Sequence, residues 1–310
     1  MKSAILRSPL LGKDRPAWVT HAILLFGVSA ASFGAVLVRY ADDAQPLALS
    51  LWRCGAGALV LLPFAGRGIG AIASRAGKLS AVAGVFLAVH FATWITSIHL
   101  TSIAASVLLV STTPVFVAVA ARVLFDARLV PRAWFGILVA LGGTVLVTGG
   151  DFGGSSLTGD ALALAGGAAA AGYVMAGGRA RQELGIFHYA FLAYAVSALL
   201  LAVVCVAAGV PLWGYSATTW WAIGGLVAGP QILGHTIINF ALRELDATTV
   251  SVSIMAEPVV ATGLALLLFS EVPSWLVVPG GAAILAGIYA VSTASRPAVP
   301  PPGGVGYCAP

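Results

Sequence analysis

Charged residues are scarce in this sequence. Asp, Glu, Lys and Arg together make up 9% of its 310 residues, whereas hydrophobic residues make up 59% and the mean hydropathy is +0.99. Soluble globular domains carry about 25% charged residues. The shortage of charge therefore excludes a soluble globular domain and predicts an all-α membrane protein that crosses the bilayer several times.

The sequence also lacks the residue patterns of cofactor sites and enzymes. Its three cysteines, Cys54, Cys205 and Cys308, do not have metal-binding spacing. The glycine-rich run at 165–178 follows no predicted strand and is itself apolar, so we do not expect it to bind a nucleotide. No Ser-His-Asp set or pair of carboxylates occurs at usable spacing. We therefore expect no metal, no cofactor, no nucleic-acid partner and no enzyme activity.

Long apolar runs are what the sequence has in abundance. A helix needs about 20 apolar residues to cross the hydrocarbon layer. Runs of that length begin near Trp18, Pro46, Leu79, Thr101, Arg132, Thr158, Phe187, Thr219, Ala247 and Pro273. The first run lacks a small-residue cleavage site at its end, so we interpret it as a retained helix rather than a signal peptide. The sequence thus predicts ten transmembrane helices.

The positions of Lys and Arg predict the orientation of these helices. If the N-terminus is cytoplasmic, every Lys and Arg except Arg39 and Arg53 falls on the cytoplasmic side. Cytoplasmic loops of membrane proteins are enriched in these two residues. We therefore expect a multi-pass protein of the inner (plasma) membrane with both termini in the cytoplasm.

The two halves of the sequence resemble each other. A shift of 144 positions aligns Pro114 with Pro258, Gly136 with Gly280 and Gly143 with Gly287, and a shift of 145 aligns His90 with His235. Each half would hold five spans, and because five is odd, the second half would be inverted in the membrane. Inverted repeats are typical of secondary transporters that work by alternating access.

The repeat also sets the expected segment boundaries. We expect an N-terminal cytoplasmic segment at 1–17, a first five-helix repeat at 18–150 and a second at 151–295. The Pro- and Gly-rich tail at 296–310 is expected to be disordered.

Polar side chains inside the spans indicate where a solute could bind. Such groups are costly in hydrocarbon and usually face a bundle interior or a water-filled cavity. The candidate substrate-binding residues are His90, Trp94, Thr113, Tyr173, Gln231, His235, Asn239 and Glu257. Pro114 and Pro258 fall near the middle of spans four and nine and predict kinks there.

Helical spacing predicts how these side chains are arranged. His90 and Trp94 are four residues apart, and Gln231, His235 and Asn239 continue the same spacing in the eighth span. The two sets would face each other across the pseudo-twofold axis. We therefore expect an aromatic wall on one side of a central cavity, and a wall of amide and imidazole groups on the other.

Each candidate also has a structural alternative. Either histidine could be a satisfied packing group, Trp94 an anchor at the membrane interface, and Tyr173 a packed neighbour. Arg53 is expected to extend outward to the interface, with substrate binding as the alternative. Glu257 is either a proton-coupling site or a carboxylate hydrogen-bonded permanently to backbone freed by the proline kink.

Two segments carry a family resemblance. Two stretches, "TSIAASVLLVSTTPVFVAVAARVLF" (101–125) and "LDATTVSVSIMAEPVVATGLALLLFSE" (245–271), are each followed by a glycine-rich span. They resemble the tandem repeats of the drug/metabolite transporter superfamily, and most of all its ten-helix branch of amino-acid and metabolite exporters, which includes the aromatic amino-acid exporter type. The resemblance implies a central cavity lined mainly by spans one, three, four, six, eight and nine. It also implies that Glu271 is the glutamate that ends the ninth span. "FDAR" (125–128) departs from the Gly-Glu pair common in the first half.

These observations favour a secondary transporter that exports amino acids, especially aromatic or other apolar ones, and related small metabolites. An exporter of drugs or cationic lipophiles is the alternative. A lipid-modifying membrane enzyme and a scaffold without transport belong to other classes, and the sequence offers neither of them a positive signal. The expected partners are the small-molecule substrate and the lipid bilayer. A monomer is one state that the sequence allows, and it leaves open proton coupling versus facilitated diffusion.

Overall fold

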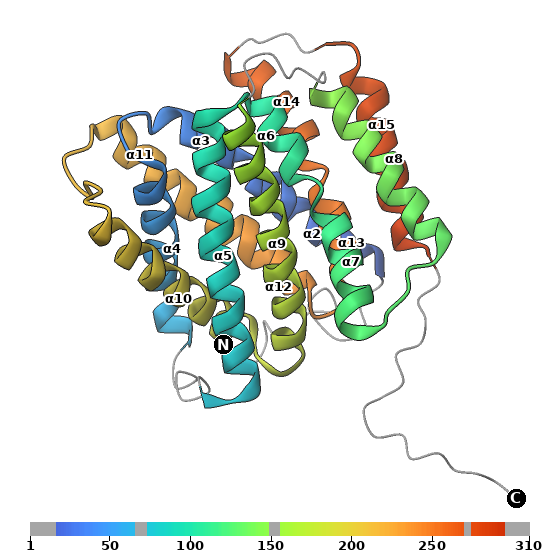
Figure 1. The fold of residues 1–310 in the computed structure, drawn as a ribbon, viewed down its shortest axis with the longest axis horizontal. Coiled ribbons are helices and arrows are strands. Elements are labelled where there is room, and N and C mark those ends of the chain that lie inside the picture. The colour runs from blue at the N-terminus through green and yellow to red at the C-terminus, as the bar shows by residue number, and fades with distance from the viewer. Residues whose placement is uncertain (1–16, 66–72, 149–155, 270–273, 295–310) are drawn as a thin grey trace, which may run out of the picture.

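The protein is a bundle of membrane-length helices (Figure 1). The structure is a computed structural model that describes residues 17–65, 73–148, 156–269 and 274–294. Within them, nine helices are long and apolar enough to cross a membrane, and Val277–Ser292 is a shorter apolar helix. These ten helices confirm the predicted all-α fold. The predicted N-terminal segment up to residue 16, the tail from residue 295 and Glu271 lie outside the described residues.

The ten spans comprise the following helices. In the first half they are α2 (Ala17–Ala31) with α3 (Phe33–Tyr40), α4 (Pro46–Ala65), α5 (Arg75–Leu100), α6 (Ile103–Val110) with α7 (Thr113–Phe125), and α8 (Pro131–Thr148). In the second half they are α9 (Leu157–Glu183), α10 (Ile186–Ala207), α11 (Ala217–Leu226) with η2 (Val227–His235) and α12 (Thr236–Ala241), α13 (Ala247–Ile254) with α14 (Glu257–Phe269), and α15 (Val277–Ser292).

Short polar residues mark where several spans begin. The side chains of five N-cap residues accept a hydrogen bond from the backbone N–H three positions later, which satisfies one of the free donors at the helix start. These residues are Ser74, Ser102, Ser156, Ser216 and Asp246. The caps place the starts of α5, α6, α9, α11 and α13 close to the predicted starts of the same spans.

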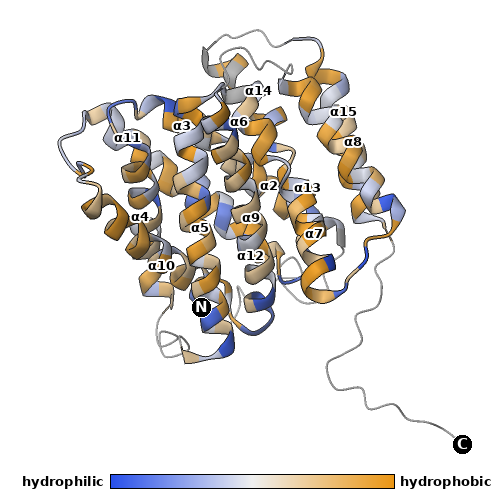
Figure 2. Ribbon diagram, viewed as in Figure 1, coloured by the Kyte–Doolittle hydropathy of each residue, from blue (hydrophilic) through white to orange (hydrophobic). Residues whose placement is uncertain are grey.

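The outer faces of the helices are apolar. Large hydrophobic side chains are exposed on many spans, including Leu59, Val123, Leu138, Val206 and Leu267. Hydrophobic residues run along the helices and hydrophilic ones gather mostly at their ends (Figure 2). So much exposed apolar surface is rare on a soluble monomer, whereas it suits contact with lipid.

The contact between α8 and α15 reveals the symmetry of the molecule. A Cβ atom on Gly136 would lie 2.8 Å from the carbonyl oxygen of Gly287, and one on Gly143 would lie 2.6 Å from that of Gly280. The earlier glycine of each helix thus meets the later glycine of the other, so the helices run antiparallel. Because Gly136 aligns with Gly280 and Gly143 with Gly287, each contact is the image of the other. This reciprocal pattern is that of a twofold axis, and it agrees with two inverted repeats.

Three spans are interrupted near their middle. Span one breaks at Ser32, between α2 and α3; span four breaks between α6 and α7; and span nine breaks between α13 and α14. Pro114 and Pro258 are the second residues of α7 and α14. Proline is well tolerated there, since the first turn of a helix has no partner for its N–H groups.

Span eight contains a different irregularity. Residues Val227–His235 form a π-helix with Pro230 inside it. A π-helix closes its hydrogen bonds from i to i+5 and therefore turns more slowly than an α-helix. This segment packs against α2, so the two irregular spans one and eight are neighbours.

Candidate substrate cavity

A cavity of about 90 Å³ lies where the interrupted helices meet. Its wall includes residues beside all three breaks, such as Ala31, Ser111 and Met255. A buried water needs about 10–15 Å³, so the cavity has room for several waters or a small solute. Spans one, three, four, six, eight and nine all contribute, as the family resemblance implied, and Arg53 adds span two. Broken helices around a mid-membrane cavity are characteristic of transporter sites.

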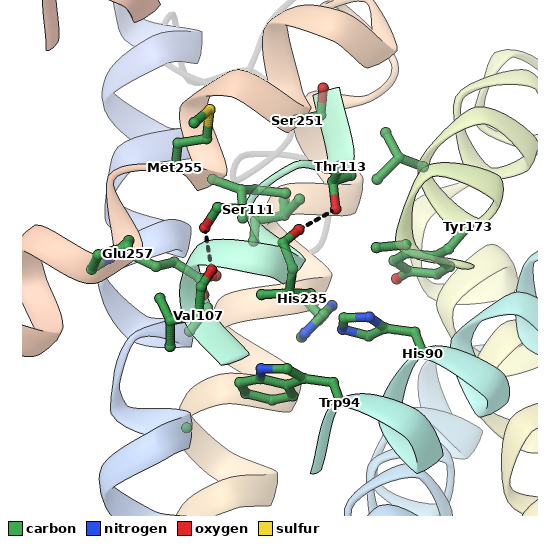
Figure 3. A pocket seen from close by; sticks show the side chains of 18 of the residues that line it. His90, Trp94, Val107, Ser111, Thr113, Tyr173, His235, Ser251, Met255 and Glu257 are labelled. Carbon is green, nitrogen blue, oxygen red and sulfur yellow. Dashed lines mark hydrogen bonds between the residues drawn. The ribbon is translucent and has the colours of Figure 1, made fainter. Parts of the chain in front are cut away.

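His90 and Trp94 form one side of the cavity wall. Their rings are stacked, with centroids 5.8 Å apart and planes 4° from parallel (Figure 3). His90 Nδ1 lies 2.9 Å from the carbonyl oxygen of Gly166. Because a carbonyl only accepts, Nδ1 carries the hydrogen, and a neutral ring then offers Nε2 as an acceptor. The interface-anchor hypothesis for Trp94 is wrong, since its indole lines the central cavity.

The predicted amide wall is not formed. Of the three polar residues in span eight, only His235 lines the cavity. Gln231 Oε1 accepts a hydrogen bond from Arg53 Nε at 2.9 Å, and Asn239 Nδ2 donates to the hydroxyl of Tyr173 at 2.5 Å. The four-residue spacing assumed an α-helix, whereas the π-helix between Gln231 and His235 turns them away from a common face.

Tyr173 fits both predictions made for it, as a residue of the cavity wall and as a packed neighbour. It lines the cavity and is also packed in the core, where its hydroxyl is held by Asn239. Its ring centroid lies 6.1 Å from that of His235. Span six can approach spans three and four closely because Gly166 and Gly167 have no side chains. A Cβ on Gly166 would lie 3.2 Å from Thr93 Oγ1, and one on Gly167 would lie 3.1 Å from the Val110 carbonyl oxygen.

The expectation that Arg53 extends to the interface is also wrong. Its side chain is only 1% exposed and lines the cavity. The guanidinium carbon lies 3.8 Å from the centre of the Phe91 ring, a cation–π contact. Gln231 reaches it because Gly57, one turn along α4, has no side chain: a Cβ there would lie 2.9 Å from Gln231 Cγ. This partner 178 positions away could not be deduced from local spacing.

Glu257 and Thr113 occupy corresponding places at the two proline breaks. Glu257 is the first residue of α14, where the helix dipole favours a negative charge. Its carboxylate lines the cavity and accepts no hydrogen bond within the described part of the chain. The bonds required by the alternative of a permanently held carboxylate are therefore not seen. Thr113, by contrast, donates to the carbonyl oxygens of Val110 (2.7 Å) and Gly167 (3.1 Å).

Two polar atoms in the cavity wall are buried without a partner among the described residues. They are Trp94 Nε1 and His235 Nδ1. Buried polar groups in native structures nearly always find a partner, so such exceptions point to a water or a ligand. The cavity wall thus combines aromatic rings with one basic residue, Arg53, and one acidic residue, Glu257. Among the residues that the structure places, no group of three or more His, Cys, Asp or Glu could hold a metal.

The chain matches a known protein family in sequence and a solved structure in fold. The sequence model of the EamA-like transporter family matches residues 18–149 and matches again at 157–293. A solved crystal structure that is 21% identical in sequence superimposes with a TM-score of 0.74, over 90% of this chain and 97% of that one, which shows a shared fold. No curated protein sequence matches the chain.

Proposed function

The chain belongs to the EamA-like transporter family, within the drug/metabolite transporter superfamily, and is a membrane transporter of small metabolites; from this premise we propose that it exports amino acids, especially aromatic or other apolar ones, and related small metabolites. The solute would bind in the central cavity and cross by alternating access. Members of this family are transporters rather than enzymes. We also propose that the protein lies in the inner (plasma) membrane with both termini cytoplasmic and works as a monomer.

The observation that carries the proposal is the chemistry of the cavity wall. Trp94, Tyr173 and Met255 present apolar surface, and a few polar groups, including Arg53 and Glu257, converge on the same space. Small-molecule sites are generally built in this way, with apolar walls and a few placed polar groups. An amino acid with an apolar side chain matches both features.

Efflux from proteoliposomes tests this proposal. Vesicles containing the purified protein are loaded with a panel of labelled amino acids, and their release is compared with that from protein-free vesicles. We expect faster release of aromatic and branched apolar amino acids than of charged ones. If none of the panel leaves faster than from protein-free vesicles, the proposed function is wrong.

The same vesicles separate the two modes of energy coupling. Glu257 is the carboxylate in the cavity wall and would be the proton site of a coupled exporter. An imposed pH gradient accelerates a coupled carrier and leaves facilitated diffusion unchanged.

Export of drugs or cationic lipophiles is the second candidate. Glu257 and the aromatic rings favour a cation. The Arg53 guanidinium in the same wall disfavours one, because its positive charge would repel the ligand inside a medium of low dielectric constant. The panel therefore includes a lipophilic cation, which we expect to leave more slowly than the apolar amino acids.

A further inference from the structure

Arg53 is a buried cation without a counterion. It lies about 10 Å along α4 from Pro46, is almost fully buried, and forms no ion pair with any residue that the structure describes. A buried charge without a partner is strongly unfavourable, so such groups are normally paired or bind an ion. The neutral Gln231 amide and the Phe91 ring orient this charge but do not neutralise it.

The contacts of Arg53 leave the end of its side chain available. A guanidinium has five N–H donors in a fixed plane. Only Nε has a hydrogen-bond partner among the described residues, and that partner is Gln231. The four N–H bonds of the two terminal nitrogens are therefore not used by the described protein, in a side chain that borders the cavity. Two parallel N–H bonds of this kind match the two oxygens of a carboxylate.

Glu257 provides the opposite charge in the same cavity. It enters from span nine of the second half, whereas Arg53 enters from span two of the first half. The two side chains line one space without forming an ion pair with each other. Trp94 and His235 line the same space.

We propose that the cavity selects zwitterions, with Arg53 binding the carboxylate of the solute and Glu257 binding its ammonium group. This inference rests on the proposed function and specifies its substrate class. A ligand that carries both charges supplies a counterion to Arg53 and to Glu257 at the same time. A solute with only one charge leaves either Arg53 or Glu257 buried and unpaired. In this arrangement Gln231 is a positioning residue, because it acts through Arg53.

Competition in counterflow tests the proposal with the wild-type protein alone. Uptake of labelled L-phenylalanine is challenged with unlabelled L-phenylalanine, phenethylamine, which lacks the carboxylate, and 3-phenylpropionate, which lacks the ammonium group. L-leucine, 3-methylbutylamine and 4-methylpentanoate form a second trio. We expect each zwitterion to compete about tenfold or more better than its amine or acid. Equal competition by the amine or the acid would overturn the proposal.

Variants identify the groups responsible. Arg53→Gln is expected to remove the preference for the zwitterion over the amine, because the amine lacks the carboxylate that Arg53 would bind. Glu257→Gln is expected to remove the preference for the zwitterion over the acid, which lacks the ammonium group. Arg181→Gln is the matched control, since Arg181 is another buried arginine, bonded to backbone carbonyls of Asn239 and Leu184, and does not line the cavity. The control should keep both preferences. Full preference for the zwitterion in a folded Arg53→Gln variant would overturn the assignment.

Thermal stabilisation keeps this inference distinct from the proposed function. A ligand that binds only the folded state raises the unfolding temperature whether or not it is transported. If the zwitterion stabilises the wild-type protein more than its amine and acid do, but no amino acid leaves the vesicles, the proposed export is wrong and the zwitterion site stands. If amino acids are exported while the amine stabilises equally well, export stands and the zwitterion site is wrong.

Discussion

At the scale of single residues, charge is scarce, and two charged side chains reach the cavity wall from opposite halves of the chain. The cavity wall receives one cation from the first half, Arg53, and one anion from the second half, Glu257. Outside the bundle core, Asp43 joins the turn after α3 to the start of α11. Its carboxylate accepts hydrogen bonds from the backbone N–H of Ser216 (2.7 Å) and from the Thr219 hydroxyl. This acid therefore links the end of span one to the start of span eight.

These bonds predict a pH dependence of stability. They hold the pKa of the Asp43 carboxyl below its ordinary value of 3.8. A depressed folded-state pKa contributes stability that is present above the ordinary value and is lost as the pH falls through the folded-state value. We therefore expect Asp43→Asn to lower the unfolding temperature at pH 7, with a difference from wild type that shrinks near pH 3.

Thermal unfolding in detergent measures this difference at both pH values. Asp42→Asn serves as the control, because Asp42 is exposed and its carboxylate has no hydrogen-bond partner within the described ranges. A gap between Asp43→Asn and wild type that is the same at pH 7 and pH 3 would contradict the role given to the ionised Asp43.

At the scale of helices, the spans fall into tightly packed and interrupted ones. The α8–α15 pair is tightly packed. Four glycines lie in the contact, and because they have no side chains, the backbones of the two helices can approach each other closely. Spans one, four and nine break beside the cavity. The breaks at Pro114 and Pro258 could be predicted from the sequence, since proline cannot continue a helix unperturbed. The break at Ser32 has no proline to mark it, and Pro230 alone does not distinguish a π-helix from a kink.

Two adjacent glycines test the packing of α8. A Cβ on Gly143 would lie 2.6 Å from the Gly280 carbonyl oxygen and 2.8 Å from the Ile284 backbone nitrogen, whereas one on Gly142 would meet no atom within 4 Å. Backbone cannot move aside as a flexible side chain can. We therefore expect Gly143→Ala to destabilise the protein by about 1–3 kcal/mol.

Gly142→Ala is the matched control for this change. An exposed glycine inside a helix costs about 0.5–1 kcal/mol relative to alanine, so this variant should be neutral or slightly more stable than wild type. Unfolding of both variants is followed by denaturant titration in detergent. Equal stability of the two would contradict the close antiparallel contact.

At the scale of the whole molecule, two inverted halves surround the central cavity. The ten spans and the repeat could be predicted because apolar length, basic loops and recurring Pro and Gly are all visible in the sequence. Cavity lining by His90, Trp94 and Glu257 followed from the rule that polar groups in spans face inward. The directions of Gln231, Asn239 and Arg53 could not be predicted, because they depend on the π-helix and on contacts between distant spans.

Counterflow by two variants of α9 shows whether the solute crosses through this cavity. Ala170 lines the cavity and Ala165, on the same helix, is exposed on the outside of the bundle. We expect Ala170→Phe to lower counterflow of labelled L-phenylalanine by about tenfold or more, because the added ring fills the space. We expect Ala165→Phe to leave counterflow near the wild-type rate. Equal counterflow by two folded variants would contradict passage through the cavity.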